Sequence, residues 1–215
     1  VFTGVPSIIA NASSTVGLIP GVFAAAWAYR RHLKPLEGVS FKALFVVSVA
    51  GGVTGALLLL YTSQTIFDVI IPWLLLLATF VFAFGKSLSV LLQARVRIGP
   101  KTVIVAQFLL SVYGGYFGGA VGIIMLALWS LLGAYDIRTL NANRTLLGGV
   151  MNCAAVVLFI IAGKVWWLQT LIILVGAVIG GYLGARFTRR MNPLHVRRVV
   201  TAISVLVTVI FFARL

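Results

Sequence analysis

Small polar side chains gather at two places in an otherwise apolar sequence. The first is Ala-Asn-Ala-Ser-Ser-Thr at residues 10–15, and the second is Asn-Ala-Asn-Arg-Thr at residues 141–145. One interpretation is that these side chains only form hydrogen bonds between membrane helices, each worth about 0.6 kcal/mol on average. The alternative is a polar lining for a substrate path. The recurrence of the cluster favours the polar lining.

A glycine-rich segment, Tyr113-Gly-Gly-Tyr-Phe-Gly-Gly-Ala-Val-Gly122, also has two interpretations. Its five glycines make a continuous helix costly, at about 1 kcal/mol each relative to Ala. The glycines could allow close helix packing. A chain break would instead expose backbone N–H groups and helix N-termini, which carry partial positive charge and suit an anion. Side-chain donors to the same site could come from Gln107, Tyr113 and Tyr116.

Groups for catalytic or metal chemistry are scarce. The three carboxylates, Glu37, Asp68 and Asp136, fall in connections or at span ends, and Cys153 is interpreted as a packing residue. No nucleophile–base set, phosphate loop or metal-ligand spacing can be assembled from these residue types. We therefore expect no enzyme, no metal and no cofactor. A pore without intramembrane carboxylates favours anions, and Arg144 either attracts an anion or only snorkels to the interface.

The composition indicates which elements must position these residues. The chain has 215 residues, 61% hydrophobic and 9% charged, with a mean hydropathy of +1.14. An ordinary soluble domain is excluded, because about a quarter of its residues would be charged. The net charge of +14 comes from basic residues dispersed in short gaps between apolar runs. That pattern is typical of orientation in a membrane and not of nucleic-acid binding.

Seven apolar runs without period-two alternation predict helices and not barrel strands. They cover about residues 5–29, 41–61, 69–85, 103–133, 145–163, 166–187 and 194–213. Residues 87–97 could form an interfacial helix or extend the third run. Glycines 51 and 55, and glycines 176, 180 and 184, are interpreted as helix-packing faces.

The run over 103–133 is too long for one ordinary span. A single crossing there divides the 17 Lys and Arg residues ten to seven between the two sides of the membrane, whereas entry and return to the same side divides them fifteen to two. Because basic residues concentrate on the cytoplasmic side, we predict a re-entrant or hairpin element.

The two halves of the chain, residues 1–98 and 99–215, show weak internal similarity. Residues 10–13 match 142–145, and glycines 51, 52 and 55 match glycines 180, 181 and 184. The predicted helices of the halves run in opposite senses, so we expect inverted repeats, an arrangement that supports alternating access. The counterpart of the glycine-rich element would precede Val1, which predicts an N-terminally truncated chain.

Two segments of the first half carry a family resemblance. Residues 4–21, followed by Ala26-Trp-Ala-Tyr-Arg-Arg31, resemble the first-half signature of the sulfite exporter TauE/SafE family of membrane permeases. Residues 113–122, 141–144 and 176–184 are similar to its second repeat. The resemblance implies a multi-pass carrier of the bacterial inner membrane that moves small anions such as sulfite, sulfonates or thiosulfate. Carried over residue by residue, it places the following nearest the substrate path: Asn11, Ser13, Ser14, Gly115, Gly118, Gly119, Asn141 and Asn143.

We therefore predict an all-α polytopic membrane protein of two inverted repeats with a Gly-rich broken or re-entrant helix element. The predicted function is that of a secondary transporter for a small sulfur-containing anion. A non-transporting membrane scaffold or accessory subunit and a passive anion channel are the alternatives. The expected partners are a small inorganic or organosulfur anion and the lipid bilayer, with no nucleic acid. Formation of a homo-oligomer is left open.

Overall fold

The computed structural model describes residues 4–36, 38–93, 98–132, 136–188 and 193–213, and every regular element in these ranges is a helix. In chain order the elements are α1 (Ser7–Tyr29), the short η1 (Arg30–His32), α2 (Phe41–Tyr61), α3 (Gln64–Gln93), α4 (Pro100–Tyr116), α5 (Val121–Ser130), α6 (Ile137–Ile161), α7 (Trp167–Thr188) and α8 (Pro193–Phe212). The predicted all-α class is confirmed.

Four helical segments are long and apolar enough to cross a membrane: Ser7–His32, Phe41–Tyr61, Gln64–Gly85 and Ile137–Ile161. Shorter apolar helices lie at Val121–Ser130, Trp167–Gly180 and Arg198–Phe212. The molecule also turns large apolar side chains outward; Trp27 is 69% exposed and Ile161 is 77% exposed. Exposed apolar surface of this extent is typical of contact with lipid, so the polytopic membrane class is confirmed as well.

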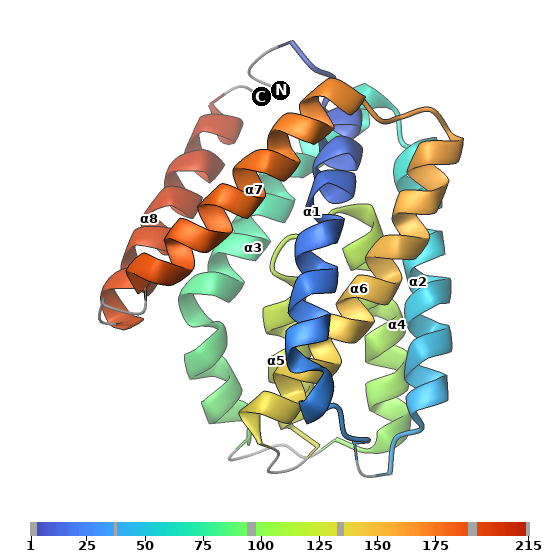
Figure 1. The fold of residues 1–215 in the computed structure, drawn as a ribbon, viewed down its shortest axis with the longest axis vertical. Helices are drawn as coiled ribbons and strands as arrows, with labels where there is room; N and C mark the ends of the chain where they lie inside the picture. The colour runs from blue at the N-terminus through green and yellow to red at the C-terminus, as the bar shows by residue number, and fades with distance from the viewer. Residues whose placement is uncertain (1–3, 37, 94–97, 133–135, 189–192, 214–215) are drawn as a thin grey trace.

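Helix α1 lies at the centre of the arrangement. It packs on α6 and α7, while α2 packs on α4 and α6, and α3 packs on α5 and α8. Figure 1 shows α2 and α4 on one side of α1, and α3 and α8 on the other. One buried cluster includes Met125, Trp129 and Leu147, and a second includes Phe67 and Phe159. These two cores hold the bundle together.

Several helix ends follow from local sequence. The Ser40 hydroxyl accepts a hydrogen bond from the Ala43 N–H at the start of α2, at 3.4 Å, and Pro100 occupies the first turn of α4. As expected from the first apolar run, Pro20 lies inside a helix. The third helix begins earlier than predicted, at Gln64, and continues to Gln93. Residues 87–93 therefore extend this helix, and 94–97 lie outside the described residues.

The long apolar run over 103–133 contains two helices in place of one. Helix α4 ends at Tyr116 and α5 begins at Val121. Figure 1 shows that α4 and α5 run in opposite directions, so that both reach the end of the molecule where α1 finishes. This path is a helical hairpin with its turn inside the bundle. Its re-entry into a membrane, the inverted repeats and the division into 1–98 and 99–215 stay predictions.

Glycines bring the backbone of α2 close to two other helices. A Cβ atom added to Gly51 would lie 2.7 Å from the Phe108 carbonyl oxygen in α4, and one added to Gly52 would lie 2.5 Å from the Met151 carbonyl oxygen in α6. Real Cβ atoms essentially never approach so closely. Beside this seam, the buried Gln107 amide donates to the Ser48 hydroxyl at 2.9 Å. The packing interpretation is thus confirmed for the glycines of α2.

For Gly176 and Gly180 of α7 the structure shows no such contact within the described residues. No atom in the described part of the chain lies within 4 Å of a Cβ placed at either position. Gly184 lies among residues whose side-chain surroundings are not described. Among the described residues, similar glycine spacing therefore occurs in a close helix contact in α2 and in open surroundings in α7.

The glycine seam gives a first prediction. We expect Gly52→Ala to destabilise the protein by about 1–3 kcal/mol, because the methyl group overlaps the α6 backbone. Gly176→Ala is the matched control, and there the higher helix propensity of Ala should leave stability unchanged or raised by up to ~1 kcal/mol. Thermal unfolding of both variants in detergent measures the difference. Equal effects at the two positions would contradict the close contact between Gly52 and the backbone of α6.

The distribution of basic residues gives a second prediction, on orientation. In a Cys153→Ser background, Gln64→Cys and Lys164→Cys should react with an impermeant maleimide from the periplasmic side. Pro35→Cys and Lys101→Cys should react from the cytoplasmic side, because the basic end of the bundle faces the cytoplasm. Reaction of Lys164→Cys and Lys101→Cys from the same side would rule out this orientation of the helices.

Candidate functional site

The candidate site begins at the break between α4 and α5, over residues 117–120. Gly118 has φ +80° and Ala120 has φ +59°, so two residues adopt the left-handed conformation. Glycine adopts it without strain, whereas alanine does so at a cost. The glycine-rich sequence thus lets the chain turn back within four residues.

Two side chains satisfy carbonyl groups that the break leaves without helical partners. The Asn11 amide of α1 donates to the Tyr116 carbonyl at 3.1 Å. The Tyr113 hydroxyl donates across the turn to the Gly119 carbonyl at 2.7 Å. Because Asn11 is 105 residues away from Tyr116, its hydrogen bond fixes the break against α1. The break is therefore a defined structure, held from two sides.

The other side of the break is the N-terminus of α5. Its first N–H groups have no intrahelical partners, and the residue before the helix, Ala120, has no side chain that could cap them. Such an N-terminus carries a partial positive charge. It suits an anion better than a cation.

A guanidinium group lies directly against this N-terminus. A Cβ atom added to Gly122 would lie 2.9 Å from Nη1 of Arg144, which belongs to α6. The buried Nε of Arg144 has no hydrogen-bond partner among the described residues. Two groups of the same sign thus meet here, an arrangement that is unfavourable until a negative charge joins them.

Both groups face a cavity of about 450 Å³ between α1, α5, α6 and α7. Its walls are formed by Gly17, Leu18, Pro20, Gly21, Val22, Ala25, Val121, Gly122, Met125, Arg144, Thr145, Gly148, Met151, Asn152, Leu174, Ala177 and Val178. No Asp or Glu occurs in this described lining. The size matches the smaller ligand sites of proteins, which are mostly apolar with few polar groups. A small anion fits both the volume and the sign of the charge.

Three of the predicted site residues meet at the break: Asn11, Gly118 and Gly119. Ser14 is next to them on α1, but its hydroxyl donates to the Asn11 carbonyl at 2.9 Å. Gly115 lies in the α2–α4 contact, close to the backbone of Gly52. Its surroundings are those of a packing residue.

The other predicted residues contact distant segments. The Ser13 hydroxyl accepts from the Trp166 N–H at 3.0 Å, just before α7. The Asn143 amide donates to the carbonyls of Lys34 and Thr139, at 2.8 and 3.1 Å. Asn141 is partly buried in the first turns of α6, where its carbonyl accepts from Thr145.

None of the eight predicted site residues lines the cavity; Arg144 and Gly122 were singled out in the sequence, but Asn152 was not. Asn152 follows Arg144 by eight residues, and Gly148 lies halfway between them, so the three share one face of α6. Helical spacing counted from Arg144 would have found Asn152. The contact between Gly122 and Arg144 joins two helices, so no local sequence pattern predicts it.

Comparison with known proteins is consistent with this architecture. Residues 1–211 match the family described as sulfite exporter TauE/SafE. A probable membrane transporter protein of Haemophilus influenzae is 26% identical over 209 residues, which cover 96% of this chain and 80% of that protein. One from Sinorhizobium, ORF9, is 23% identical over 181 residues, covering 84% and 68%.

The probable membrane transporter protein YfcA of Escherichia coli K12 is 25% identical over 163 residues, or 76% of this chain. The matched region spans only 61% of the length of that relative. No solved structure matches the chain. Since the family match extends over nearly the whole sequence, the chain belongs to the sulfite exporter TauE/SafE family.

Proposed function

We propose that this protein is a secondary transporter that moves a small sulfur-containing anion, such as sulfite, a sulfonate or thiosulfate, across the bacterial inner membrane. Membership of the sulfite exporter family and relatives named probable membrane transporters support transport. The observation that carries the choice of an anion is Arg144: its guanidinium lies beside the uncapped N-terminus of α5, and its buried Nε has no partner among the described residues.

An oxyanion in the cavity needs several hydrogen-bond donors and no base. The guanidinium of Arg144 and the N–H groups at the start of α5 supply charge-assisted donors. Of the side-chain donors that α6 contributes to the cavity lining, Asn152 remains besides Arg144, because the Thr145 hydroxyl already donates to the Asn141 carbonyl at 2.7 Å. In this proposal Arg144 and Asn152 contact the anion directly.

Asn11, Gly118 and Gly119 do not contact the anion in this proposal, and they affect its binding only through the shape of the break. They hold the N-terminus of α5 at the cavity, so we assign them a positioning role. Ser13, Ser14, Gly115, Asn141 and Asn143 support the surrounding helices. Alternating access would come from movement of the first half, residues 1–98, against the second, 99–215.

The proposal predicts the effect of removing the guanidinium. In proteoliposomes, saturable uptake of radiolabelled sulfite, thiosulfate or a short sulfonate should fall about tenfold or more in Arg144→Gln, since a hydrogen bond to a charged group is worth about 1.5–3 kcal/mol. Arg138→Gln, which removes an exposed charge two turns earlier in α6, is the control and should keep normal uptake.

Three results would contradict this assignment. Equal uptake by Arg144→Gln and the wild type would remove Arg144 from the site. Conductance without saturation would identify a passive channel. Absence of uptake of all three anions by folded wild-type protein would favour a scaffold.

The proposal also separates two asparagines that look alike in the sequence. We expect Asn11→Ala to raise the KM for the anion, because the Tyr116 carbonyl loses its partner and the break shifts. Asn143→Ala should lower thermal stability by about 1–3 kcal/mol, since the amide bridges α6 to the carbonyl of Lys34, and should leave KM unchanged. A KM change as large in Asn143→Ala as in Arg144→Gln would place Asn143 on the anion.

A further inference from the structure

A second hollow of the molecule is an apolar groove of about 350 Å³ on its outer face. Helices α1 and α2 both pack on α6 and hardly touch each other, so α6 forms the floor between two walls. The walls include Phe23 and Phe45, and the floor includes Leu146, Val150, Cys153 and Val157. All three helices are candidate membrane spans, so this groove faces lipid.

The length of the groove matches one leaflet of a bilayer. Its floor runs from Leu146 to Val157, which is about 17 Å along a helix at 1.5 Å per residue. That is roughly half of the ~30 Å hydrocarbon core. A groove of this length and about 350 Å³ has room for a single acyl chain.

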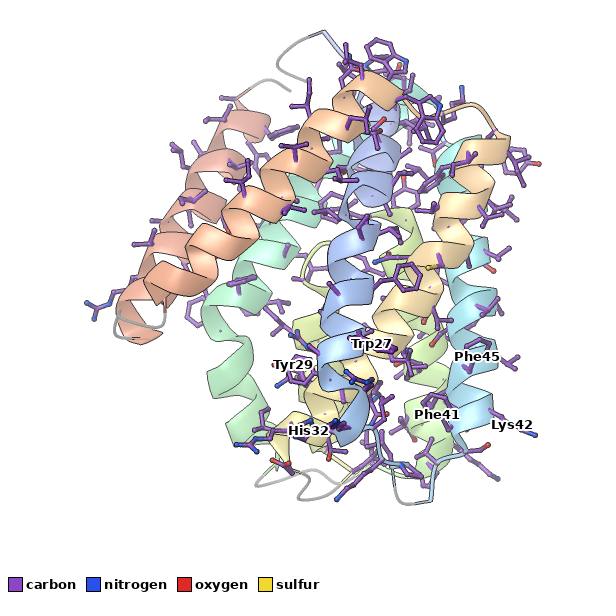
Figure 2. The ribbon with its side chains drawn as sticks, in the orientation of Figure 1. Trp27, Tyr29, His32, Phe41, Lys42 and Phe45 are labelled. Carbon is purple, nitrogen blue, oxygen red and sulfur yellow. The ribbon has the colours of Figure 1, made fainter. Side chains whose placement is uncertain are left out.

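Basic and aromatic residues stand at one end of the groove. On α1, Phe23, Trp27 and Arg30 follow one another at helical spacing, and the Arg30 guanidinium lies 4.1 Å from the centre of the exposed Trp27 ring. On α2, exposed Lys42 precedes Phe45 by one turn. Figure 2 shows Trp27 and Phe45 at a similar level, with Lys42 below them near the lower end of α2.

This arrangement suits both parts of a phospholipid, the acyl chain and the charged headgroup. Tryptophan is enriched at membrane–water interfaces, and a Lys or Arg near the surface of a membrane adds about 1 kcal/mol of attraction to anionic lipid. We propose that the groove binds one anionic phospholipid, with an acyl chain along α6 and the phosphate held by Arg30 and Lys42. The lining of this groove shares only Val22 with that of the cavity that contains Arg144.

Native mass spectrometry of the delipidated protein tests the site. Added phosphatidylglycerol should remain bound at one molecule per chain, and phosphatidylcholine with the same acyl chains should bind more weakly. The double variant Arg30→Gln/Lys42→Gln should lose phosphatidylglycerol affinity about tenfold or more. The matched control Lys101→Gln/Lys164→Gln removes two exposed charges away from the groove and should keep the wild-type affinity.

Cys153, the one cysteine of the chain, reports whether the lipid lies in the groove. Bound phosphatidylglycerol should slow alkylation of its thiol several-fold, and this protection should disappear in Arg30→Gln/Lys42→Gln. Unchanged alkylation in the presence of bound lipid would place the lipid elsewhere. Equal retention of the two lipids, unaltered affinity in the double variant, or a dimer that protects Cys153 without lipid would each overturn the proposal.

Discussion

A helix that is interrupted inside a packed bundle must find new partners for its backbone groups, and the structure of this protein depends on how the break after Tyr116 meets that demand. The carbonyl side is satisfied within the protein, by the Asn11 amide and the Tyr113 hydroxyl. The N–H side points to the cavity, where the nearest charged group is the guanidinium of Arg144. The fold thus satisfies the carbonyl groups of the break, whereas its N–H groups face the cavity, where we propose that the anion binds.

The packing of α2 sets where the break lies. Glycines 51, 52 and 55 bring α2 against the backbones of α4 and α6, so α4 can move little along its axis without a clash. Asn11 then ties the end of α4 to α1. The position of α5, and with it the distance between its N-terminus and Arg144, follows from contacts made on the far side of the bundle.

Local composition was enough to predict the helices, because the apolar runs are properties of short segments. The hairpin over 103–133 was predicted from the distribution of basic residues along the whole chain. Local composition was not enough to assign roles to the polar residues. Asn143 meets a carbonyl 109 residues away, and Ser13 meets an N–H 153 residues away, so their hydrogen bonds depend on tertiary packing. The same limit explains Gly51 and Gly180, which match in the comparison of the two halves: Gly51 lies against the backbone of α4, whereas no described atom lies within 4 Å of a Cβ placed at Gly180.

In the function that we propose, selectivity among sulfur oxyanions cannot come from the charged groups alone. Arg144 and the N-terminus of α5 would meet the same oxygen atoms in sulfite and in a sulfonate, so they distinguish an anion from a neutral molecule and little more. The rest of the cavity wall is apolar, with Leu18 and Val22 from α1, and Leu174 and Val178 from α7. Burial of a short alkyl group against this wall contributes about 0.8 kcal/mol per methylene. The apolar wall formed by α1 and α7 is therefore the part of the site that can favour an organic sulfonate over an inorganic anion.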